Sequence, residues 1–68
     1  MKPTIKLNHR KHPWREGATV SSLMAENRFD FTNIIVFVNG AIIDEAAWED
    51  TAVAAGDKVE MIHIFGGG

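Results

Sequence analysis

The sequence has 68 residues, enough for one small domain but too few for a core that encloses a deep substrate pocket. Apolar residues make up 46% and charged residues 24%, a balance typical of a globular chain and not of a disordered one. Cysteine is absent, which excludes disulfides, thiolate chemistry and cysteine-based zinc sites. No apolar run approaches the ~20 residues that cross a bilayer, and none follows the basic N-terminus, so we expect a cytoplasmic protein without membrane contact.

Charge is unevenly distributed although the net charge is only −2. The first fifteen residues carry five cations and no acid: Lys2, Lys6, Arg10, Lys11 and Arg15. Acidic residues gather in the last third of the chain. A nucleic-acid-binding domain of this size is expected to be basic as a whole. We therefore interpret the basic segment as a solvated hairpin and expect no nucleic-acid partner.

Two short strands are predicted first. The segment 4–7 alternates polar and apolar residues, the pattern of a half-buried strand. Residues 8–11 are polar and turn-like, and residues 12–14 are expected to return as a second strand. Pro13 cannot donate a backbone hydrogen bond, which restricts that strand to a sheet edge.

A helix is predicted next, with Thr19 as its N-cap because the hydroxyl can accept a bond from an unpaired backbone amide. Three apolar residues then follow at the spacing of one helical face: Val20, Leu23 and Met24. We expect the helix to end near Arg28, whose charge suits a helix C-terminus. Phe29 and Phe31 are expected to close one end of the core.

The remaining chain reads as three strands. Residues 34–38 form an apolar, β-branched run that ends at Asn39-Gly40, a strong hairpin signal. Residues 41–43 are the expected partner strand. An irregular or single-turn helical segment follows over 44–55, and residues 58–65 are expected to form the final strand. Because a single helix can cover only one face of a sheet, the element order predicts an α+β roll.

The domain is expected to span residues 1–65, with 66–68 as a flexible glycine tail. If the helix covers one sheet face, four apolar residues remain on the open face: Ile35, Phe37, Ile62 and Ile64. An apolar patch that faces water usually marks a partner site. We interpret these residues as a docking patch. The alternatives are a covering loop or a one-residue register slip, which would exchange the two faces.

Three glycines end the chain: Gly66, Gly67 and Gly68. Glycine packs nothing and loses the most entropy on ordering, so the tail cannot stabilise the fold. Three extended residues reach ~10 Å, enough to enter a narrow channel in a partner. The unhindered carboxylate of Gly68 could attack the α-phosphate of ATP, and a sulfur donor could then displace AMP to leave a thiocarboxylate. A frayed end and a remnant of cloning are the alternative readings.

Motifs along nearly the whole length carry a resemblance to a known family. They are Ile5-Lys6-Leu7-Asn8, Gly17-Ala18-Thr19-Val20, Val36-Phe37-Val38-Asn39-Gly40, Trp48, Gly56-Asp57-Lys58-Val59-Glu60-Met61-Ile62-His63 and the closing Gly66-Gly67-Gly68. In this order the chain resembles the ThiS family of thiamine-biosynthesis sulfur carriers, and more distantly MoaD and ubiquitin. The resemblance implies a ubiquitin-like β-grasp fold, with a mixed sheet of four to five strands packed on one helix.

The resemblance also implies the chemistry and its partners. A ThiF-like enzyme would use ATP to adenylate Gly68, with no cofactor bound stably by the carrier itself. A cysteine desulfurase or related donor would supply sulfur, and a thiazole synthase of the ThiG type would receive it. Two features depart from the family pattern. The first turn is Asn8-His9 where Asn-Gly is usual, and Asp44-Glu45 stands where Pro and a basic residue are common.

The other candidate residues have structural interpretations. His9 and His12 read as exposed turn residues without a third ligand, so no metal site is expected. His63 reads as a half-buried strand position, with partner contact as the alternative. Trp48 is expected to plug the core over the final strand. No nucleophile–base pair, paired carboxylates or metal cluster can be assembled, so we expect a protein that is not itself an enzyme.

Three functions compete. A sulfur carrier requires a thiocarboxylate at Gly68, with thiazole formation as its most favoured pathway and molybdopterin synthesis as the MoaD-type alternative. A ubiquitin-like modifier would end instead in an isopeptide bond to a lysine. A non-catalytic interaction module would tolerate loss of the tail but not Phe37→Asp.

Overall fold

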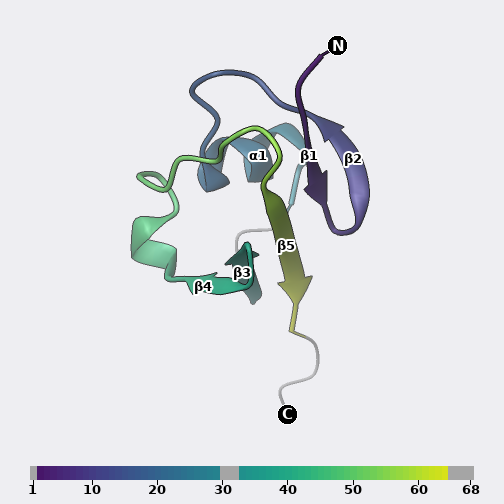
Figure 1. Ribbon diagram of the computed structural model, residues 1–68. Coiled ribbons are helices and arrows are strands. Elements are labelled where there is room, and N and C mark those ends of the chain that lie inside the picture. The colour runs from purple at the N-terminus through teal and green to yellow at the C-terminus, as the bar shows by residue number, and fades with distance from the viewer. Residues whose placement is uncertain (1, 30–32, 65–68) are drawn as a thin grey trace.

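The computed structural model describes residues 2–29 and 33–64. Its elements in chain order are β1 (Thr4–Leu7), β2 (Arg10–Pro13), α1 (Val20–Glu26), β3 (Ile34–Val38), β4 (Ala41–Ile43), the 3-10 turn η1 (Glu45–Ala47) and β5 (Lys58–His63). The strands form one sheet in the order β2-β1-β5-β3-β4, with β5 in the centre (Figure 1). The β1–β5 pair is parallel and the other pairs are antiparallel. The chain is therefore an α+β roll with a mixed sheet.

The first hairpin is tighter than predicted. Asn8 and His9 both have left-handed φ values, 50° and 71°, as a two-residue hairpin turn requires. Leu7 therefore pairs directly with Arg10, and β2 covers Arg10–Pro13. The expected turn over 8–11 is two residues too long, and the strand expected over 12–14 begins two residues earlier, at Arg10. The edge position expected from Pro13 is confirmed, because β2 is the first strand of the sheet.

The N-terminus of α1 is capped as predicted. Thr19 Oγ1 accepts a hydrogen bond from the Ser22 amide at 3.1 Å, and Ser22 Oγ accepts one from the Thr19 amide at 2.9 Å. Together the two bonds form a capping box. A helix of seven residues is too short to be stable alone, so this cap and the packing of its apolar face carry its stability.

The C-terminus of α1 lies two residues before Arg28, and charge is not what ends it. Glu26 is the last helical residue, and Arg28 has a left-handed φ of 58°. The Phe29 amide donates to Met24 O at 2.9 Å and the Arg28 amide donates to Ala25 O at 3.3 Å. This is the bond pattern of a Schellman motif, in which arginine occupies a position that glycine usually takes.

The core lies between the sheet and α1. Its buried residues are Ile5, Leu7, Val20, Leu23, Met24, Ile34, Val36, Trp48, Val53, Val59 and Met61. Trp48 is 5% exposed and its Nε1 donates to Ile43 O at 3.1 Å, which confirms its predicted place in the core. Val38, which shares a face of β3 with Val36, is half-buried and packs against this cluster. Phe29 also packs against the cluster, whereas Phe31 lies outside the described residues.

Strand β5 ends earlier than predicted, at His63. Its pairing continues one residue further, because the Ile64 amide donates to Asn33 O at 2.7 Å. Phe65, the predicted end of the strand, lies outside the described residues. In the described part of the chain, no helix is long and apolar enough to span a membrane.

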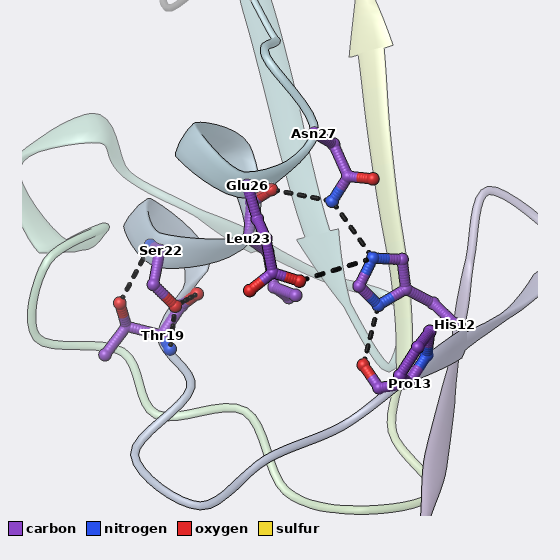
Figure 2. A network of polar contacts seen from close by, with 7 residues as sticks. All are labelled: His12, Pro13, Thr19, Ser22, Leu23, Glu26 and Asn27. Atoms are coloured by element: carbon purple, nitrogen blue, oxygen red, sulfur yellow. Dashed lines mark hydrogen bonds and ion pairs between the residues drawn. The ribbon is translucent and has the colours of Figure 1, made fainter.

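A polar network joins β2 to α1 (Figure 2). His12 Nδ1 lies 2.7 Å from Pro13 O, and a carbonyl can only accept, so Nδ1 carries the proton in this contact. Asn27 Nδ2 lies 3.1 Å from His12 Nε2, and Glu26 Oε1 lies 3.7 Å from the same nitrogen. Asn27 Nδ2 also donates to Leu23 O at 2.8 Å. The network ties the first hairpin to the end of the helix.

Candidate functional site

The candidate site is the sheet face opposite α1. Ile35 pairs with Ile62 across β3 and β5, and Phe37 pairs with Glu60. Since side chains alternate between faces, Ile35, Phe37 and Ile62 point away from the buried positions Val36 and Met61. Ile62 and Ile64 are each 49% exposed, and Ile35 and Phe37 are half-buried. The four residues singled out in the sequence therefore share the open face.

Sequence reasoning missed one member of this apolar surface. Ile42 of β4 pairs with Phe37 and is 65% exposed. The Asn39-Gly40 motif could have predicted the position of Ile42. A two-residue turn places Val38 opposite Ala41 and therefore Phe37 opposite Ile42. We call Ile35, Phe37, Ile42, Ile62 and Ile64 the apolar patch.

A shallow hollow of about 300 Å³ opens beside the patch at the β3–β4 edge. Ile35 and Ile42 line it on one side, and Asp44 and Glu45 line it at the start of η1. Both acidic residues are exposed. The departure Asp44-Glu45 from the family pattern therefore gives this end of the face an acidic rim.

The three histidines occupy different environments. His9 is in the turn, as interpreted, and its Nε2 lies 3.6 Å from Glu60 Oε2. His12 is not an exposed turn residue: it lies in β2, and its side chain is only 16% exposed because it packs toward α1. His63 is half-buried, with its ring centroid 6.1 Å from that of Phe29. Within residues 2–29 and 33–64, no three His, Asp or Glu side chains gather as metal ligands would.

The side chains of two asparagines at hairpin turns form hydrogen bonds with the backbone of β5. Asn8 Oδ1 accepts from the Met61 amide at 2.7 Å, and Asn8 Nδ2 donates to Met61 O at 3.2 Å. Asn39 Oδ1 accepts from the Lys58 amide at 2.9 Å, and its Nδ2 donates to Asp57 Oδ1 at 3.0 Å. The strand that leads to the chain end is thus held along both of its sides.

The three glycines that the sequence singles out, Gly66, Gly67 and Gly68, lie outside the described residues. The structure does describe the approach to them. Ile62 and Ile64 belong to the apolar patch and lie four and two residues before Gly66 in the chain. A partner that covers the patch would therefore meet the start of the tail.

The fold and this face define a class of protein. A mixed sheet with a central C-terminal strand, a single helix on one face and an apolar opposite face make the chain a β-grasp domain. The model of the ThiS family matches residues 3–68, and the chain belongs to that family.

A solved structure supports the assignment. The chain is similar to the crystal structure of the thiamine biosynthesis protein ThiS from Geobacter metallireducens, with a TM-score of 0.77 and 26% sequence identity. The similarity covers 96% of this chain and 99% of that chain. The β-grasp fold implied by the sequence resemblance is therefore confirmed. No curated protein matches the chain.

Proposed function

We propose that this protein carries sulfur as a thiocarboxylate on Gly68, for thiazole formation in thiamine biosynthesis. The observation that carries the proposal is the family match, which extends through residue 68 and so includes the three glycines. The similar protein from Geobacter metallireducens is itself named for thiamine biosynthesis. In this proposal the folded domain presents the C-terminal residue Gly68 to its partners, and the carboxylate of Gly68 is the group that reacts.

The chemistry needs two transfers at one carbon. A carboxylate oxygen of Gly68 attacks the α-phosphorus of ATP, pyrophosphate leaves, and an acyl-adenylate forms. A sulfide-level nucleophile then attacks the acyl carbon, the C–O bond to AMP breaks, and a thiocarboxylate remains. No oxidant or reductant is needed when sulfide is the donor. Glycine favours both steps because no Cβ hinders approach to the carbon.

The catalytic groups belong to partners. A ThiF-like adenylating enzyme binds and uses ATP, a donor such as a cysteine desulfurase supplies sulfur, and a ThiG-like thiazole synthase accepts it. The carrier's own contribution is recognition, and we assign that role to the apolar patch. Gly66 and Gly67 form the segment that enters the partner's channel, where a backbone without side chains lies flat against the walls.

Intact mass after reaction tests the proposal. The protein is incubated with a ThiF-like enzyme, ATP and sulfide, and the expected result is a mass gain equal to the exchange of one oxygen for sulfur. A variant that lacks Gly68 should show no gain. Unchanged mass, with an enzyme that activates its own carrier in the same buffer, would exclude the carrier function. Stable conjugates to lysine would indicate a modifier instead.

The acceptor is tested separately. The purified thiocarboxylate is offered to a ThiG-like thiazole synthase and, in parallel, to a molybdopterin synthase subunit. Sulfur transfer to the thiazole alone supports the proposed pathway. Transfer only to the molybdopterin precursor would support the MoaD-type alternative while leaving the carrier chemistry intact.

A further inference from the structure

Three lysines stand side by side across neighbouring strands of the open face. Lys6 of β1 pairs with Lys11 of β2 on one side and with Lys58 of β5 on the other. Lys6 alternates with the buried Ile5 and Leu7, so it points away from α1, and its directly paired neighbours share that face. All three lysines are exposed. We call Lys6, Lys11 and Lys58 the lysine row.

The lysine row opposes folding. Like charges at directly paired positions of a sheet destabilise it. The ion pairs among the described residues are His9–Glu60 and His12–Glu26, and neither contains a lysine. Glu60 shares the open face, but its carboxylate is the one that faces His9. Among the described residues, no lysine of the row therefore takes part in an ion pair.

The row and the apolar patch form one continuous surface. Lys58 starts β5, and Ile62 and Ile64 lie on the same face four and six residues later. At ~3.3 Å per strand residue, the row lies roughly 20 Å from Ile64, the last described residue before the tail. A partner that holds the tail and covers the patch therefore reaches the row only if its interface extends along the whole face.

We propose that the lysine row docks against an acidic surface of the protein that activates Gly68. The inference rests on the proposed function, and it specifies that the docking surface of this partner is negatively charged. Contact at both ends of β5 fixes the direction in which the carrier lies, and so the direction in which its tail points. Paired opposite charges also raise the rate of encounter, most strongly at low salt.

The surroundings of the row favour a protein partner over a nucleic acid. Nucleic-acid binding by charge needs a basic domain, and this chain has a net charge of −2. The row also shares the open face with exposed isoleucines, which a phosphate backbone would leave uncovered. An apolar centre with a charged rim is the usual composition of a protein interface.

Charge reversal tests the row. Lys6→Glu, Lys11→Glu and Lys58→Glu are made singly and together, and adenylation by the ThiF-like enzyme is followed by pyrophosphate release at low and at physiological salt. We expect the triple variant to raise KM for the carrier by about tenfold or more at low salt, with kcat unchanged. The dependence of KM on salt should reverse as well, because salt would then screen a repulsion between the altered row and the acidic surface.

Arg15→Glu is the matched control. It makes the same change of charge as each single variant, at an exposed residue that borders α1 and lies off the open face. Its KM should stay close to that of the wild type. The triple Gln variant covers the case in which charge reversal disturbs the fold. It should be as stable as the wild type or more stable, because it relieves repulsion, and its KM should still rise.

The outcomes separate the two proposals. If both triple variants are adenylated normally, with unchanged KM and unchanged salt dependence, the proposed docking role of the lysine row is overturned. The proposed carrier function would still stand. An equal rise in KM for Arg15→Glu would also overturn it, because net charge alone would then explain the effect. Failure of the wild type to be adenylated would remove the proposed function and the row with it. Loss of oligonucleotide binding alone would assign the row to nucleic acid.

Discussion

At the scale of single residues, Asn8 does more than form a turn. Its side-chain amide pairs with both the amide and the carbonyl of Met61, as a backbone residue of β1 would. It also takes a left-handed conformation, which asparagine tolerates better than most residues. His9 shares that conformation without the same tolerance. We therefore expect substitution by glycine to change the free energy of unfolding in opposite directions at Asn8 and at His9.

Asn8→Gly should destabilise the fold by about 1–3 kcal/mol, because two polar groups of the buried Met61 backbone lose their partner while the turn geometry is kept. His9→Gly should stabilise it by about 1 kcal/mol, because glycine adopts the left-handed conformation without strain. Urea unfolding measures both. A more stable Asn8→Gly variant would mean that the Met61 bonds contribute nothing.

At the scale of elements, α1 depends on its ends. Its seven residues are fixed by the capping box at Thr19 and by the Schellman turn at Arg28. The contact between His12 Nε2 and Asn27 Nδ2 joins the helix to the first hairpin (Figure 2). A short helix held in this way has little stability to spare when one end is released.

Thr19→Ala should lower the free energy of unfolding by about 1 kcal/mol, because the Ser22 amide loses its acceptor. Thr19→Ser keeps the hydroxyl and should cost only a few tenths of that amount. Denaturant titration followed by circular dichroism measures the difference. Equal losses for the two variants would mean that the hydroxyl is not the stabilising group.

Strand β5 offers a second test, because adjacent residues face opposite sides. Met61 is 3% exposed and Ile62 is 49% exposed. Met61→Asp should unfold the domain by burying an unpaired charge. Ile62→Asp should leave stability within about 0.5 kcal/mol and should raise KM for the adenylating enzyme. Thermal unfolding and adenylation kinetics check both. Unchanged KM for Ile62→Asp would remove that residue from the docking surface.

At the scale of the whole molecule, the proposed function gives the domain and its chain end separate tasks. Within residues 2–29 and 33–64, the sheet, α1 and the buried core already form one packed unit. The open face, in contrast, contributes little to the core and carries the apolar patch and the lysine row. One face of the sheet thus packs against α1, and the other carries the residues that we propose for recognition.

Removal of residues 66–68 should leave the free energy of unfolding within about 0.5 kcal/mol of the full-length value, because glycine contributes no packing. The same variant should gain no sulfur in the intact-mass assay. A large loss of stability on truncation would show that the tail packs against the domain. It would also remove the basis for treating residues 1–65 and 66–68 as separate units.

Local patterns in the sequence determined the elements. Alternation placed β1, and an apolar, β-branched run placed β3. The Thr19 cap and apolar spacing placed α1, and Asn39-Gly40 placed the hairpin of β3 and β4, because each signal depends on residues close together in the chain. The same alternation put Ile35, Phe37, Ile62 and Ile64 on one face, as the structure has them.

Only the tertiary structure decided what joins distant segments. The bond from Asn8 to Met61 spans 53 residues, and the alignment of Lys6 with Lys58 needs the parallel β1–β5 register, which no local pattern encodes. The inward turn of the His12 side chain likewise follows from packing, which overrides residue preference. Register between distant strands is set by the shared core, and that core exists only once the chain has folded.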